Sequence, residues 1–204
     1  MSQVRVKICG LTRAEDVAAA VSNGADAVGF VFVPASKRCI SSAQAAGLCQ
    51  AVPAFISRVG LFLNQPASEV WQVLAQVPLS LLQFHGNEDA GFCRQFGRPY
   101  IKSLGLQQGQ DVRKLEEGFP DAAGILVDSH EPGGLGGTGK TLDWSQVQPG
   151  KRPLILAGGL DPQNVAVAIR TVRPWAVDVS SGVEVSPGIK DAGAIKRFIN
   201  EAKQ

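Results

Sequence analysis

Two residues that could donate and accept protons each end a short apolar run. Asp128 follows Ile125 to Val127 and opens into a glycine-rich segment. Cys9 ends an alternating run, and Lys7, two residues earlier, would share its face of a strand. A nearby ammonium favours the thiolate form of a cysteine. Cys9 and Asp128 are therefore candidates for acid–base chemistry, although a small buried cysteine explains Cys9 equally well.

Arg38 and His85 also follow apolar runs and could contact a substrate. The planar guanidinium of Arg38 suits a carboxylate, and the alternative is a solvated loop arginine. His85 could carry a proton or contact a ligand, but a hydrogen-bonded structural histidine is favoured because the sequence does not indicate its partner.

Two donor-rich segments near the C-terminus predict a phosphate site. One contains Gly158 and Gly159, and the other contains Ser180, Ser181 and Gly182. Glycines expose backbone N–H groups to an anion, and serine hydroxyls add further donors. In parallel barrels the loops after strands seven and eight often bind phosphate together.

The segment 134–141 formally matches the phosphate-binding P-loop, but its context differs. A P-loop follows a strand directly and opens a long helix. Here residues 129–133 intervene, and Pro149 and Gly150 follow before a long helix can form. We therefore favour an active-site loop over nucleotide binding, with a plain glycine-rich linker as the other alternative.

Strand-type runs alternate with helix-type segments eight times along the 204 residues. We expect strands at 4–9, 27–33, 56–63, 79–85, 100–104, 125–128, 153–157 and 176–179. Helical segments are expected after each of them, at 12–24 with a capping box from Thr12 to Glu15, 42–51, 66–76, 88–96, 111–117, 142–147, 162–171 and 191–202. This alternation, without a linker-like break, predicts a single domain over residues 1–204: a compact parallel (β/α)8 TIM barrel. In a closed barrel the first and eighth strands are neighbours, so Lys7 and Asp178 could pair inside it.

Composition narrows the functional classes. The formal charge of +2 includes no basic block, which argues against a nucleic-acid surface. The four cysteines show no Cys-x-x-Cys spacing, so neither a metal site nor a disulfide framework is predicted. Without a signal-like N-terminus or a membrane-length apolar stretch, we expect a soluble cytoplasmic protein.

Seven motifs, in order along the whole chain, closely resemble the phosphoribosylanthranilate isomerases of tryptophan biosynthesis. They lie at residues 7–12, 36–38, 59–64, 83–86, 128 with 136–139, 156–160 and 178–184. The departures are small: Phe84 stands where leucine is usual, and Cys39 where an aromatic residue often follows the arginine.

The resemblance implies an Amadori rearrangement of a phosphorylated small molecule, with no cofactor. Asp128 would be the general acid that protonates the ring oxygen, and Cys9 the base that removes the C2′ proton. Arg38 would bind the anthranilate carboxylate. Because free Asp titrates near ~3.9 and free Cys near ~8.5, each would mostly hold the wrong protonation state at neutral pH. The site must shift both pKa values or use minor protonation forms.

Three alternatives remain at this point. The weakest is a lyase or synthase of the same pathway, because the sites of those enzymes rely on lysines and glutamates. The histidine-pathway isomerase catalyses the same reaction on a substrate with two phosphates, but such enzymes use paired aspartates where this chain has Cys9. A non-catalytic sugar-phosphate-binding barrel would keep the glycine loops without needing Cys9 or Asp128. A monomer is favoured over an oligomer.

Overall fold

The computed structural model describes residues 3–105, 111–128 and 143–204. Eight parallel strands close into a barrel in sequence order, with β1 hydrogen-bonded to both β2 and β8. The barrel strands are β1 (Arg5–Cys9), β2 (Ala27–Val31), β3 (Ser57–Phe62), β4 (Leu81–Phe84), β5 (Tyr100–Gly105), β6 (Gly124–Asp128), β7 (Leu154–Leu156) and β8 (Ala176–Val179). The predicted (β/α)8 barrel and its eight strands are confirmed.

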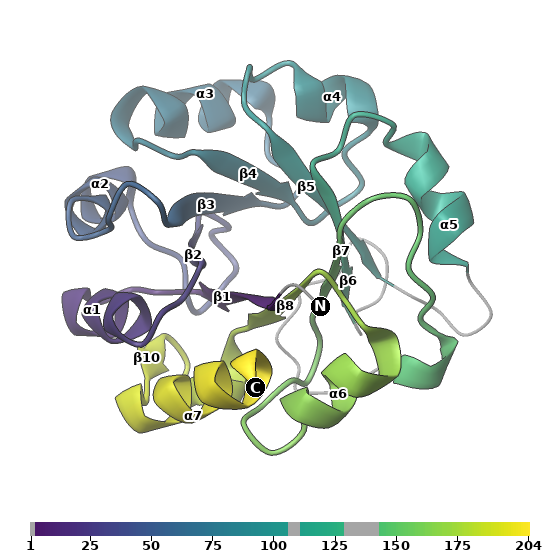
Figure 1. Ribbon diagram of the computed structural model, residues 1–204. Coiled ribbons are helices and arrows are strands. Elements are labelled where there is room, and N and C mark those ends of the chain that lie inside the picture. Colours follow the sequence, from purple (N-terminus) through teal and green to yellow (C-terminus); the bar gives the residue numbers. More distant parts are fainter. Residues whose placement is uncertain (1–2, 106–110, 129–142) are drawn as a thin grey trace.

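Helices surround the strands, as the view along the barrel shows (Figure 1). They are α1 (Ala14–Ser22), α2 (Ser42–Cys49), α3 (Ala67–Gln76), α4 (Ala90–Arg94), α5 (Val112–Leu115), α6 (Val165–Val172) and α7 (Ala192–Lys203). Short 3-10 turns add η1 (Glu116–Gly118), η2 (Trp144–Gln146) and η3 (Ser181–Val183). The expected helical segment at 142–147 is only the turn η2. None of the helices in the described ranges is long and apolar enough to cross a membrane.

Side chains alternate across each strand and divide the apolar core into two layers. On β1, Val6 and Ile8 face the helices and join the large outer core, while Lys7 and Cys9 belong to the barrel interior. A small inner cluster fills part of the barrel with Ile101, Leu126, Ile155, Ala157 and Ala176. The inward positions therefore include polar side chains as well as apolar ones.

The structure corrects one expectation at the start of α1 and adds an element after β8. The N-cap of α1 is Arg13, without a side-chain cap, so the predicted capping box from Thr12 is wrong. The Thr12 hydroxyl instead donates a 2.5 Å hydrogen bond to the Gly188 carbonyl. Gly188 lies in an unpredicted antiparallel hairpin of β9 (Glu184–Ser186) and β10 (Ile189–Lys190). This tertiary hydrogen bond directs the Thr12 side chain toward the hairpin.

Candidate active site

One pocket at the carboxyl ends of the strands gathers most of the predicted site residues. It is lined by Cys9, Val31, Val33, Ser36, Arg38, Leu61, Leu63, Gln83, His85, Asp128, Asp178 and Ser180. Cys9, Asp128 and Ser180 stand at or directly after the ends of β1, β6 and β8. The barrel therefore brings together groups that are up to 171 positions apart in the chain.

A buried ion pair lies inside the barrel beside this pocket. Lys7 and Asp178 occupy paired positions of β1 and β8, and the Lys7 Nζ lies 3.0 Å from the Asp178 Oδ1, as predicted. Burial opposes the charge on Lys7, but Asp178 and Cys9 outweigh that cost and raise the pKa of Lys7 to about 12. Lys7 therefore carries a fixed positive charge next to the cysteine.

Burial and Lys7 act on the Cys9 thiol in opposite directions. Burial raises the pKa of the thiol above its ordinary value, whereas Lys7 lowers it, as the sequence predicts for a neighbouring ammonium. The cost of removing the thiolate from water is the larger of the two effects, so the pKa is raised. In the free protein Cys9 is mainly a thiol at neutral pH.

Asp128 and His85 reach the pocket from β6 and from the residue after β4. Asp128 is buried and pairs in the sheet with Gly105 of β5. His85 is also buried, and its Nδ1 lies 3.4 Å from the Gln83 Nε2. The 134–141 segment, predicted to be an active-site loop, lies outside the described residues.

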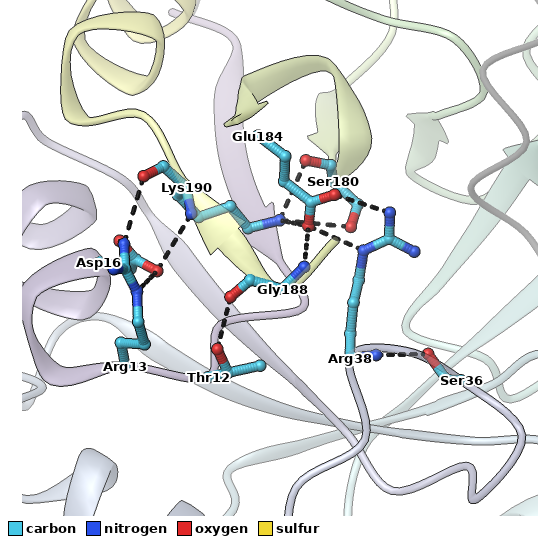
Figure 2. A network of polar contacts seen from close by, with 9 residues as sticks. All are labelled: Thr12, Arg13, Asp16, Ser36, Arg38, Ser180, Glu184, Gly188 and Lys190. Carbon is cyan, nitrogen blue, oxygen red and sulfur yellow. Dashed lines mark hydrogen bonds and ion pairs between the residues drawn. The ribbon is translucent and has the colours of Figure 1, made fainter. Parts of the chain in front are cut away.

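Arg38 is held by Glu184, which pairs in turn with Lys190, and the sequence analysis assigned neither of these residues. Its Nε and Nη2 donate to the two Glu184 carboxylate oxygens, each at 2.8 Å. The Lys190 Nζ lies 2.8 Å from the Glu184 Oε1. Figure 2 draws this ion pair beside Arg38. Burial opposes the Glu184 charge, but Arg38 and Lys190 outweigh it and hold the pKa of this carboxyl below its ordinary value. Arg38 is therefore a fixed side chain and not a solvated loop arginine.

The two glycine-containing loops lie against each other, as expected for strands β7 and β8. Gly158 and Gly159 have φ angles of +83° and +66°, which strongly favour glycine. A side chain on Gly182 would overlap the Leu160 carbonyl oxygen. Of the predicted phosphate residues only Ser180 lines the pocket with Cys9. The backbone N–H groups of Gly158 and Gly159 donate to no residue in the described parts of the chain, so they are available to a ligand.

A (β/α)8 barrel that gathers a thiol, two carboxylates, an imidazole and a guanidinium around one carboxyl-end pocket has the architecture and the functional groups of a barrel enzyme. The family model for N-(5'-phosphoribosyl)anthranilate isomerase matches residues 6–201. The isomerase of that name from Pseudomonas fluorescens strain Pf0-1 is 51% identical over 204 residues, covering 100% of both chains.

Solved structures give the same result. The crystal structure of phosphoribosyl anthranilate isomerase from Thermotoga maritima is 45% identical with a TM-score of 0.86, covering 98% of each chain. A second isomerase structure, in complex with reduced 1-(o-carboxyphenylamino)-1-deoxyribulose 5-phosphate, is 41% identical with a TM-score of 0.80 and the same 98% coverage of each chain. The chain therefore belongs to the N-(5'-phosphoribosyl)anthranilate isomerase family, and it is an isomerase of tryptophan biosynthesis.

Proposed function

We propose that Asp128 and Cys9 are the general acid and the general base of this isomerase. The observation that carries the proposal is that both side chains line one pocket, from strands three apart in the closed barrel order. A proton donor and a proton acceptor on separate strands can act on two atoms of one bound sugar.

The two steps balance without an external reagent. Asp128 donates its proton to the ring oxygen as the C1′–O bond breaks, and the nitrogen lone pair forms the C1′=N bond of a Schiff base. Cys9 then removes the C2′ proton. The electron pair of the broken C2′–H bond forms a C1′=C2′ double bond, and the C1′=N pair returns to the nitrogen, which gives an enolamine. Tautomerisation gives the 2′-ketone of the 1-deoxyribulose product. Asp128 then regains a proton from solvent and Cys9 releases one to it, so no net proton or electron is exchanged and the reaction needs no redox cofactor.

Arg38 is proposed to bind the anthranilate carboxylate, and the loops with Gly158, Gly159, Ser181 and Gly182 the phosphate. Arg38 lines the same pocket as Cys9, at its edge between β2 and α2. Ser180 joins this pocket to the two glycine-containing loops, in which the N–H groups of Gly158 and Gly159 donate to no described residue and could bind an anion. His85, beside Gln83, is proposed to contact the substrate rather than to transfer a proton.

The enzyme is further proposed to act as a cytoplasmic monomer on this small phosphorylated substrate. All the groups assigned above come from one chain, so a second copy is not needed to complete the pocket. Sedimentation of the purified protein tests the monomer, and fractionation of the source cells tests the location.

The direct test follows the fluorescence of phosphoribosylanthranilate after the purified protein is added. We expect the signal to decay with enzyme concentration, and a Cys9→Ser, Asp128→Asn double variant to decay no faster than buffer. Binding without turnover by the unmodified protein would instead indicate a sugar-phosphate-binding barrel. Faster turnover of the bisphosphorylated histidine-pathway substrate would contradict the assigned specificity.

A further inference from the structure

Arg38, Glu184 and Lys190 form a buried cluster of three charges at the pocket edge (Figure 2). Their side chains are 14%, 5% and 0% exposed, respectively. The Glu184 Oε1 accepts hydrogen bonds from Arg38, from Lys190 and, at 3.2 Å, from the Gly188 backbone N–H. Glu184 is thus the central member, and its position is set by β9 and the turn that follows.

The hydrogen bonds of Arg38 divide its guanidinium into two edges. The Nε–Nη2 edge is occupied by Glu184 in a bidentate pair. Nη1 donates to no residue in ranges 3–105, 111–128 and 143–204, and Figure 2 shows it pointing away from Glu184. A guanidinium has five N–H donors in one plane, so the second edge remains able to bind another carboxylate. Glu184 therefore leaves the ligand-binding capacity of Arg38 intact while restricting its rotation.

Lys190 keeps the cluster positive. Glu184 alone would neutralise Arg38 and weaken its attraction for an anion, but the ammonium of Lys190 on the same carboxylate leaves one net positive charge. Lys190 also donates to the Ser180 carbonyl at 3.0 Å, which connects the cluster to the end of β8. Burial of the three groups reduces solvent screening of that charge.

The backbone next to Cys9 is shaped around the same cluster. A Cβ on Gly10 would lie 2.5 Å from the Arg38 Cδ and 3.1 Å from the Ser180 Oγ. Gly10 also has a φ of +73°, which a residue with a side chain rarely adopts. The Arg38 stem therefore packs directly on the residue after Cys9. A shift of Arg38 would change the packing against the backbone next to the proposed base.

We propose that Glu184 is a positioning residue of the isomerase: supported by Lys190, it orients Arg38 so that the free guanidinium edge receives the substrate carboxylate. This inference rests on the role of Arg38 proposed above. It adds a function for β9 and β10, the two strands outside the barrel, which hold Glu184 and Lys190.

The test is a double-mutant cycle of Arg38→Ala and Glu184→Gln, with KM and kcat measured for each variant. We expect Arg38→Ala to raise KM by about tenfold to 100-fold, as for loss of a charge-assisted hydrogen bond. Glu184→Gln should raise KM by roughly tenfold with a much smaller change in kcat, and the double variant should be no worse than Arg38→Ala alone. Glu184→Asp, which retains the charge, should recover part of the lost affinity.

A matched control separates positioning from folding. Glu116 is another buried carboxylate, and it accepts backbone N–H groups of Lys151 and Arg152 away from the pocket. Glu116→Gln should lower the melting temperature without changing KM. Lys190→Met, which leaves the Arg38–Glu184 pair neutral, should raise KM and serves as the second variant if Glu184→Gln does not fold.

The possible failures are distinguishable. An unchanged KM in Glu184→Gln, or a double variant whose KM rises by the product of the two single effects, would overturn the positioning role while leaving the Arg38 assignment intact. An unchanged KM in Arg38→Ala would overturn the carboxylate assignment itself, and the inference with it. Neither result would affect the proposed acid and base.

Discussion

The two ends of the barrel each contain a cavity, and the larger one is not at the proposed active site. The amino-end cavity has a volume of about 240 Å³ and includes Arg5, Asp26, Phe55 and Trp175, whereas the carboxyl-end pocket has about 80 Å³. Lys7 borders the amino-end cavity, but its ammonium pairs with Asp178, which borders the other. The proposed active site is therefore assigned from the chemistry of its lining residues and not from its volume.

The charged groups at the amino end are engaged in holding the fold together. Asp26 accepts the Val6 backbone N–H at 2.8 Å and pairs with Lys203 at 2.9 Å. The Arg5 guanidinium lies 4.3 Å from the centre of the Trp175 ring. At the carboxyl end, the Cys9 thiol, the Asp128 carboxylate and the Arg38 guanidinium line one pocket. Substitutions at the two ends should therefore separate into effects on stability and effects on kinetics.

The largest effect is expected from Asp128→Asn at the carboxyl end. The amide cannot act as a carboxylic acid toward the ring oxygen, so kcat should fall by about 10²- to 10⁴-fold while KM changes much less. Steady-state kinetics and thermal unfolding of the variant provide the measurement. A tenfold rise in KM with kcat preserved would assign Asp128 to binding instead.

Gly182→Ala should have the next largest effect. The added methyl group overlaps the Leu160 carbonyl oxygen and must push the loops after β7 and β8 apart. Displacing the phosphate donors in this way should raise KM by about tenfold to 100-fold.

The matched control for this loop is Gly47→Ala in α2, where an added Cβ meets nothing within 4 Å. It should leave KM unchanged and slightly stabilise the protein. An unchanged KM in Gly182→Ala, despite the overlap, would argue against phosphate binding at these loops.

The pH dependence of kcat gives the next effect in size. Burial raises the pKa of Cys9 above its ordinary value, and the active form of a base is deprotonated. The thiolate fraction should therefore increase by about tenfold per pH unit from about pH 7 to 9, and kcat should increase with it where proton removal from the bound Schiff base limits the rate. A plateau below about pH 8 would mean that Lys7 overcomes the cost of burial in the complex.

Trp175→Ala tests the amino end and should have the smallest effect. Trp175 is 45% exposed, and its main described partner is Arg5. Loss of this cation–π contact should cost about 0.5 to 1 kcal/mol of unfolding free energy. Denaturant unfolding measures this cost. Both kcat and KM should remain at their original values. A clear change in either would contradict the expectation that substitutions at the amino end affect stability and not kinetics.

The barrel and most of the pocket could be predicted from the sequence because their signals are local. Each barrel strand is a short run of mainly apolar residues, and parallel strands place the residues that end such runs at one edge. Cys9, Asp128 and Ser180 could be located by that rule alone. The Lys7–Asp178 pair follows from closure, since β1 and β8 become neighbours.

The missed features depend on contacts between distant parts of the chain. Glu184 and Arg38 are 146 positions apart, and the hairpin of β9 and β10 is too short to show a strand period. The raised pKa of Cys9 comes from burial by the closed barrel, whereas the sequence displays only the nearby lysine. The capping box failed for the same reason, because the Thr12 side chain bonds to the distant Gly188 and α1 has Arg13 at its N-cap.

The most direct test of the central claim, that Cys9 is the base of the rearrangement, is the kcat of Cys9→Ser at neutral pH with thermal unfolding measured in parallel. Serine has a similar shape but is a far weaker base. We predict a loss of at least about 100-fold in kcat, with KM and the melting temperature nearly unchanged. Retention of more than about a tenth of kcat would contradict the assignment, and His85, in the same pocket, would become the first candidate for the base.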